Sequence, residues 1–270
     1  MAKQIYHLYN AAEIIDQRLA VEIGERYIVL VAGTKDTVAG LEFYETDEND
    51  LNETLQHIKE QSQLLNRSYS ETNVYYNLHE AVLVPVAQFN TSIASELLDV
   101  AFGNNAAARV NVENINVAPG TVNVYRSNED WQDVINNNYF RAVTKRHLYS
   151  HIVENAVAAN ENLTVQFYQS EMIVVAVKNK QLQLVRSFSY TNDADVLYHL
   201  LNVCKQVDID TAEATLSISG FITTDSGNYK QLQKYFGKLK LNNASKNLLP
   251  PDQLKQYPSH YFTSFFNLLS

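Results

Sequence analysis

The sequence predicts an α/β protein of two similar lobes, because one order of strands, turns and helix occurs twice. Residues 27–65 contain an apolar β-branched run, a polar turn, a second strand and a helix, and the same order returns in residues 172–205. Six of 24 positions are identical when residues 27–50 are set beside 172–195 without gaps. A short strand also precedes each copy. Each copy is therefore predicted to be an antiparallel three-stranded meander followed by a helix.

The preceding strands span residues 19–23 and 163–167. Each helix then has a capping residue at its predicted start, Asp47 in the first copy and Asn192 in the second, with an acid three residues later. Such oxygens accept hydrogen bonds from first-turn N–H groups and suit the positive end of the helix dipole. Apolar residues at helical spacing predict the buried faces. These are Leu51, Leu55, Ile58 and Leu65 in the first helix, and Leu197, Leu200, Leu201 and Cys204 in the second.

The rest of the first half is predicted to hold further strands and helices. Residues 1–17 lack a clean period and are expected to form a lead-in that is partly helical. Pro85 cannot donate a ladder hydrogen bond, so the apolar run around it is predicted to be an edge strand. The first predicted elements are strands 73–76 and 81–86. A helix to residue 102 follows, capped by Thr91 or Ser92, and its predicted buried residues are Ile93, Leu97, Val100 and Ala101. Then come a hairpin of strands 109–117 and 121–125, which turns at Pro119 and Gly120, and helices 128–137 and 145–159.

The second half continues with a strand at 214–220, a capped helix at 226–236 and a strand at 238–241. Residues 242–251 are expected to be a loop, because Pro250 and Pro251 end it. Residues 260–270 carry aromatic and leucine side chains at helical spacing. Exposed apolar patches of this kind are rare on monomers, so we expect this aromatic tail to dock on the body of the chain. The alternative is a partner-binding peptide.

Composition excludes several classes of protein. The 270 residues are 46% hydrophobic, as in an ordinary globular protein, and suffice for two modest lobes. A membrane span or signal peptide is not apparent in the sequence. The single cysteine, Cys204, excludes an intrachain disulfide. The cytoplasm is therefore the expected compartment. Residues 1–140 hold 20 acids and 8 bases, whereas 141–270 hold 10 acids and 13 bases. The acidic first half argues against binding nucleic acid or an anionic membrane surface.

The order meander, helix, strand, helix and strand, occurring twice, resembles the paired ribonuclease H-like lobes of the actin-like ATPase superfamily. The segments TNVYYNLHEAVLVPVAQF at 72–89 and LSISGFITTDSGNYKQLQKYF at 216–236 also resemble a bacterial family of unknown function with this fold. The resemblance spans nearly the whole chain. It implies two lobes, at 1–140 and 141–270, with mixed five-stranded sheets around a cleft.

The resemblance also implies where a nucleotide would bind. In active members, one hairpin from each lobe holds the phosphates with an Asp-x-Gly motif, and a Gly-Gly loop holds the adenosine. Here the first hairpin has only Glu22-x-Gly24 with Glu25 beside it, and the second, at 165–171, has neither the Asp nor the Gly. The adenosine loop corresponds to residues 219–221, with the single glycine Gly220. These three departures argue against ATP hydrolysis.

Other candidate sites have simpler explanations. His147, His151 and Glu154 have the spacing of metal ligands on one helix face, but a solvated or capping histidine pair is the commoner arrangement. Cys204 lies on an apolar helix face and is interpreted as a core residue. Trp131 and the 17 tyrosines are compatible with an interface, although tyrosines alternating through strands are mostly sheet packing. The lysines at 230, 234, 238 and 240 are interpreted as a solvated face.

We therefore expect a non-catalytic cytoplasmic protein that serves as an interaction or scaffold protein for an unidentified protein partner. No catalytic, cofactor-binding or metal-binding residue is assigned, and neither a cofactor, a nucleic acid nor a membrane is expected as a ligand. The alternative is a divergent ATP-binding switch or kinase-like enzyme that uses the cleft between the lobes. A third hypothesis, a zinc enzyme, would use His147 and His151.

Overall fold

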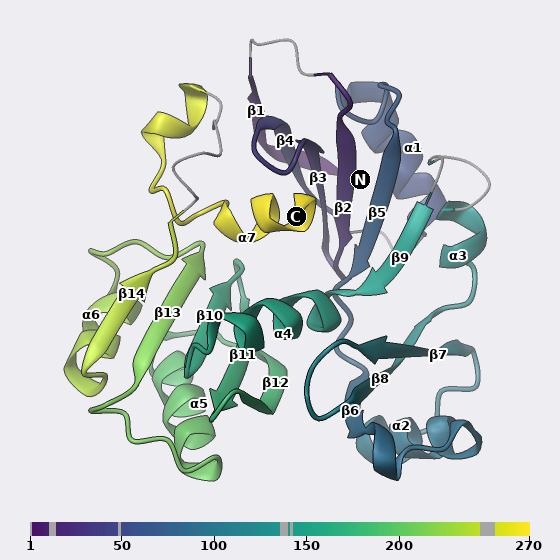
Figure 1. The fold of residues 1–270 in the computed structure, drawn as a ribbon. Coiled ribbons are helices and arrows are strands. Elements are labelled where there is room, and N and C mark those ends of the chain that lie inside the picture. Colours follow the sequence, from purple (N-terminus) through teal and green to yellow (C-terminus); the bar gives the residue numbers. More distant parts are fainter. Residues whose placement is uncertain (1, 11–14, 48–49, 136–139, 141–142, 244–251) are drawn as a thin grey trace.

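Two large β-sheets with helices against them form the two lobes of the computed structural model, and a small third sheet lies beside the first lobe (Figure 1). The structure describes residues 2–10, 15–47, 50–135, 140, 143–243 and 252–270. The first sheet has the strand order β1-β4-β3-β2-β5-β9 and the second β12-β11-β10-β13-β14. The small sheet has the order β6-β8-β7.

The strands of the first sheet are β1 (Lys3–Tyr9), β2 (Arg18–Ile23), β3 (Tyr27–Gly33), β4 (Val38–Glu45), β5 (Glu71–Tyr76) and β9 (Val143–His147). Those of the second are β10 (Leu163–Phe167), β11 (Glu171–Lys178), β12 (Gln181–Ser189), β13 (Thr215–Gly220) and β14 (Lys238–Leu241). The small sheet contains β6 (Ala81–Pro85), β7 (Ala108–Ile115) and β8 (Thr121–Asn128). The α-helices are α1 (Leu51–Gln61), α2 (Ala94–Phe102), α3 (Trp131–Val134), α4 (Leu148–Ala159), α5 (Asp193–Gln206), α6 (Gly227–Tyr235) and α7 (Thr263–Phe266).

The two large sheets share one topology. In each, a three-stranded antiparallel meander is extended by two parallel strands: β5 and β9 beside β2, and β13 and β14 beside β10. The meanders and the strands that follow them agree with the sequence-based prediction. The predicted division at residue 140 stays a prediction, and β9 continues the first sheet beyond it.

The first sheet has six strands where five were expected. Residues 3–9, predicted as part of an irregular and partly helical lead-in, form β1 and pair antiparallel with β4. Only Leu8 of this strand is fully buried, so its side chains give little of the apolar alternation that marks a strand. The predicted helix at 145–159 was also too long, because residues 143–147 form β9 and α4 begins at Leu148.

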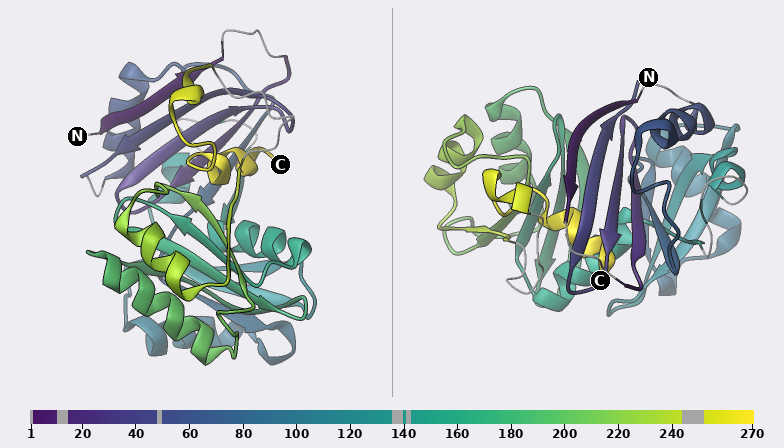
Figure 2. Two further views of the ribbon diagram at one scale, coloured as in Figure 1. Left: turned by 90° about the vertical axis from the view of Figure 1, so that its left-hand side faces the viewer. Right: turned by 90° about the horizontal axis from the view of Figure 1, so that it is seen from above.

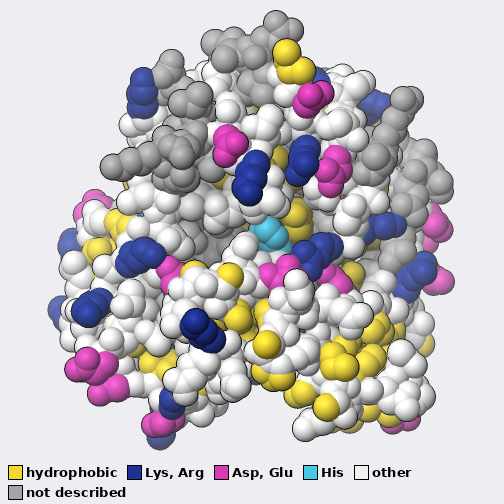
Figure 3. Space-filling model, viewed as in Figure 1, with side chains coloured by type: hydrophobic (Ala, Val, Ile, Leu, Met, Phe, Trp, Pro, Cys, Tyr) yellow, Lys and Arg dark blue, Asp and Glu magenta, His cyan; other side chains and the backbone are white. Residues whose placement is uncertain are grey.

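Two details of helix packing differ from the prediction. The N-cap of α1 is Asp50 rather than Asp47, because the Asp50 carboxylate accepts hydrogen bonds from the backbone N–H groups of Asn52 and Glu53. Helix α2 buries Ala94 and Leu98 against the small sheet, while Val100, predicted to be buried, is 90% exposed. Figure 3 shows hydrophobic side chains gathered on this face around α2 and the small sheet. The predicted N-cap of α5, by contrast, is confirmed at Asn192, and Asp195 completes a capping box with it.

The core lies in layers on both sides of the large sheets. Helix α1 covers one face of the first sheet with Leu51, Leu55 and Ile58, and helices α5 and α6 cover one face of the second. The opposite faces of the sheets are turned toward the middle of the molecule, where the C-terminal segment lies between the lobes (Figure 2). This arrangement places the hairpin ends of β2–β3 and β10–β11 next to one another.

Candidate functional site

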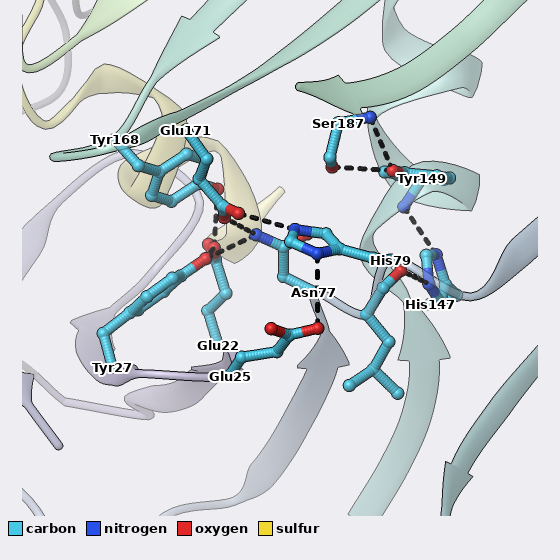
Figure 4. A network of polar contacts seen from close by, with 11 residues as sticks. Glu22, Glu25, Tyr27, Asn77, His79, His147, Tyr149, Tyr168, Glu171 and Ser187 are labelled. Carbon is cyan, nitrogen blue, oxygen red and sulfur yellow. Dashed lines mark hydrogen bonds and ion pairs between the residues drawn. The ribbon is translucent and has the colours of Figure 1, made fainter. Parts of the chain in front are cut away.

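The two hairpins that the sequence singled out meet directly across the lobe boundary (Figure 4). The phenol of Tyr168, which follows β10, donates a hydrogen bond of 2.6 Å to the Glu22 carboxylate in β2. Tyr27 in β3 donates to the same Glu22 oxygen over 2.5 Å. The two tyrosine rings stack with their centroids 5.1 Å apart and their planes at 28°. Tyrosine side chains therefore occupy the space between the two hairpins.

Glu22 is a buried carboxyl with one unsatisfied oxygen. Its side chain is fully enclosed, and Oε2 has no hydrogen-bond partner among the described residues. Burial raises its pKa to about 7, although the two tyrosine hydrogen bonds work against this shift. Glu42, equally buried in β4, accepts hydrogen bonds at both oxygens from two tyrosines, a serine and two backbone N–H groups. Glu22 thus accepts fewer hydrogen bonds than Glu42. Burial favours the neutral form of Glu22.

Four more side chains extend this contact toward solvent. Asn77, just after β5, donates to the Tyr27 hydroxyl over 2.6 Å and to Glu171 in β11 over 3.1 Å. The Nε2 atom of His79 lies 2.6 Å from Glu171, and its Nδ1 atom lies 3.3 Å from Glu25. The hydrogen bond to Glu171 raises the pKa of His79. Together, these groups form what we call the inter-hairpin network, which consists of Glu22, Glu25, Tyr27, Asn77, His79, Tyr168 and Glu171.

The glycines at these positions accommodate parts of the chain itself. A Cβ atom at Gly24 would lie 2.3 Å from the Tyr27 ring. Gly220, at the end of β13, has a φ of +88°, and a Cβ there would lie 2.0 Å from the carbonyl oxygen of Phe167. Both glycines are required for close approach of neighbouring groups. Their presence is therefore explained without a nucleotide.

The aromatic tail docks on the body of the chain, as expected. Phe262, Phe265, Phe266, Leu268 and Leu269 are buried in one cluster with residues of both lobes. The Phe265 ring lies about 6 Å from the rings of Phe43, Tyr168 and Phe221. The predicted cleft between the lobes is filled along this line by aromatic side chains, next to the inter-hairpin network.

The three proposed zinc ligands point to different partners. His147 Nε2 lies 3.0 Å from the Leu78 carbonyl, and its Nδ1 accepts from the Tyr149 backbone N–H as the N-cap of α4. His151 lies 3.1 Å from Asn155, and Glu154 forms an ion pair with Arg146. Burial lowers the pKa of His147 to about 3 and that of His151 to about 4. Within the described ranges, no three His, Cys, Asp or Glu side chains cluster as metal ligands.

Cys204 and Trp131 occupy different surroundings. Cys204 is buried against the second sheet, and burial raises the pKa of its thiol to about 11, as suits a core residue.

Trp131 is the first residue of α3 and contributes to the wall of a pocket of about 960 Å³ in the first lobe. We call this the first-lobe pocket; it lies between the β2–β3 turn, the start of α1 and the end of β8. Sequence reasoning missed it, because its walls come from five separate stretches of chain.

The family of the chain follows from a match over most of its length. Residues 9–239 match the model of a family described as a protein of unknown function (DUF3822). The chain belongs to this family. No curated protein matches the chain.

Solved structures show the fold. A Bacteroides thetaiotaomicron protein described as having an actin-like ATPase fold and unknown function has a TM-score of 0.74 and 14% identity, covering 94% of this chain and 96% of that one. A structure of the PilM–PilN type IV pilus biogenesis complex has a TM-score of 0.58 and 10% identity, covering 95% and 98%. The chain therefore has the actin-like ATPase fold that its sequence resembled. None of the described helices has the length and apolar character to cross a membrane.

Proposed function

We propose that this DUF3822 protein is a non-catalytic interaction or scaffold protein of the cytoplasm that has kept the actin-like ATPase fold. The observation that carries the proposal is the direct hydrogen bond from Tyr168 to Glu22, which joins the two hairpins where the resemblance would place the phosphates. A triphosphate there would have to separate the stacked rings of Tyr27 and Tyr168.

The charges around the hairpins also oppose a nucleotide. Triphosphates are held by backbone N–H groups, cations and a magnesium ion that carboxylates orient. Glu25 and Glu171 bring two carboxylates to this place, and His79 contacts both of them, so neither is free to orient a magnesium ion. The glycines that would admit phosphate or adenosine lie against Tyr27 and Phe167 instead.

A protein partner is supported by a structural neighbour. PilM, which shares the fold at a TM-score of 0.58, was solved in a complex with PilN. We propose by analogy that the DUF3822 chain also acts through protein contacts.

The test is a calorimetric titration with ATP and magnesium at millimolar concentrations, combined with a hydrolysis assay. We expect neither saturable heat nor phosphate release. Saturable heat that disappears when Tyr168 is replaced by Trp, which enlarges the side chain between the hairpins, would overturn the proposal. That result would favour the alternative, a divergent ATP-binding switch or kinase-like enzyme.

A further inference from the structure

The first-lobe pocket adjoins the inter-hairpin network, because Glu25 and His79 belong to both, while all of its lining residues lie in the first 131 residues of the chain. Its floor is apolar and includes Ile23, Ile28, Leu51 and Leu78. Side chains of the first sheet and of α1 thus form a surface that suits aliphatic groups.

The rim of the pocket is acidic. Glu25, Asp47, Glu80, Glu129 and Asp130 line it, against two arginines. One of these, Arg126, has a side chain only 3% exposed, and its guanidinium is engaged by Glu80, Asp99 and the Gly103 carbonyl. The charge of Arg126 is therefore balanced within the wall. His79 contacts Glu25, and among the lining residues Arg26 alone stands against Asp47, Glu129 and Asp130, so the pocket attracts a cation.

A hydrogen-bond donor in the wall also lacks an acceptor. The indole Nε1 of Trp131 is buried and has no partner among the described residues. Its ring lies 6.1 Å from the ring of Tyr76, which positions it on the first lobe. Because this N–H group is shielded from solvent, it offers no hydrogen bond to a ligand, and Trp131 contributes the apolar surface of its ring to the wall.

We propose that the first-lobe pocket binds a peptide segment of a partner protein that carries lysine or arginine beside aliphatic side chains. The basic groups contact Glu129 and Asp130 at the rim, and the aliphatic groups cover the floor. This inference rests on the proposed function, because it names the chemistry of the partner that an interaction protein would bind.

The chain provides its own reporter for the test. Trp131 is the only tryptophan in the sequence, so tryptophan fluorescence reports on the wall of this pocket alone. The probe is the synthetic peptide acetyl-Leu-Lys-Leu-Lys-Leu-amide, compared with the same peptide carrying Glu or Gln in place of Lys. We expect a saturable change with the lysine peptide and weaker binding as the salt concentration rises.

The variants distinguish the rim from general surface charge. Glu129 and Asp130 are both exposed, so the double variant Glu129→Gln, Asp130→Asn is expected to fold normally and to bind the lysine peptide at least about tenfold more weakly. The control double variant Glu60→Gln, Glu213→Gln removes two exposed acids outside the pocket and should bind like the wild type.

Three results would overturn the proposal. These are no saturable fluorescence change at millimolar lysine peptide, equal binding of the Glu or Gln peptide, and unchanged affinity in the rim variant. Each of them leaves the outcome of the ATP titration as it was, so failure of this inference is distinguishable from failure of the proposed function.

Discussion

The Tyr168 hydroxyl lies 2.6 Å from the Glu22 carboxylate, although the two residues are 146 positions apart in the chain. This hydrogen bond joins the turn after the first strand of the second meander to the first strand of the first meander. It is buried, and Tyr27 and Asn77 extend it on the first-lobe side. The two lobes are therefore held together at the hairpin ends by polar contacts as well as by aromatic packing.

Replacing Tyr168 by Phe should destabilise the protein by about 1–3 kcal/mol. The substitution keeps the ring but removes a donor to the buried Glu22 carboxyl, and an unsatisfied buried group costs about that much. Urea unfolding measures the effect. Tyr235→Phe, at a half-exposed position on α6, is the matched control and should change the free energy of unfolding by less than about 0.5 kcal/mol. Equal effects at both positions would contradict the assigned role of Tyr168.

Glu22→Gln should remove a pH dependence of stability. Burial raises the pKa of Glu22 in the folded state from its usual 4.5 to about 7, so the folded protein binds a proton more readily than the unfolded chain. The contribution of Glu22 to the free energy of unfolding is then most favourable below pH 4.5. Roughly 3 kcal/mol of this contribution is lost as the pH rises to 7. The amide accepts the same tyrosine hydrogen bonds without titrating.

Measurements of the free energy of unfolding at pH 5 and pH 8 test this prediction. The variant should gain stability relative to the wild type as the pH rises, because only the wild type carries the penalty of a buried charge. Glu171 raises the pKa of His79, but His79 is present in both proteins, so its own titration cancels in the comparison. A constant difference between the two proteins across this range would refute the assignment.

His147→Asn should reduce acid destabilisation. Burial lowers the pKa of His147 to about 3, so its neutral form contributes stability that is complete above pH 6.5 and is lost as the pH falls toward 3. Between pH 7.5 and 4.5 the loss is roughly 3 kcal/mol. Asparagine can still cap α4 but does not titrate. On acidification over this range, the melting temperature of the variant should fall less than that of the wild type. An equal fall in both proteins would exclude His147 as a source of acid destabilisation.

Phe265→Ala should be among the most destabilising substitutions in the aromatic tail. The ring is 1% exposed and contacts aromatic side chains of both lobes, and removal of such a side chain costs about 3–5 kcal/mol. Val100→Ala on the exposed side of α2 is the control and should be nearly neutral. Chemical unfolding of both variants measures the difference. A neutral Phe265→Ala would mean that the tail is not part of the core.

The sequence predicted elements whose signals are local. The meanders follow from apolar β-branched runs and polar turns, and the α5 cap follows from Asn192 and Asp195 three residues apart. Strand β1 was missed because its place in the sheet depends on pairing with β4 rather than on its own periodicity. The face of α2 was wrongly predicted because Leu98 packs on a small sheet formed by strands from three stretches of the chain.

The site was only partly accessible from the sequence. Glu22 was singled out by its likeness to a phosphate-binding motif, but nothing local connects it with Tyr168 or with Glu171. His79 and Asn77 gave no signal because their roles come from contacts with the other lobe. A pairing set by tertiary structure leaves no periodic or spacing pattern to detect.

Hydrogen exchange of the two hairpins with and without ATP and magnesium tests the central claim most directly. If Tyr27 and Tyr168 close this position, millimolar ATP will leave the exchange rates of residues 22–27 and 167–173 unchanged. Slower exchange in both hairpins upon addition of ATP would show that the nucleotide enters between them, and would contradict the account of a non-catalytic interaction protein.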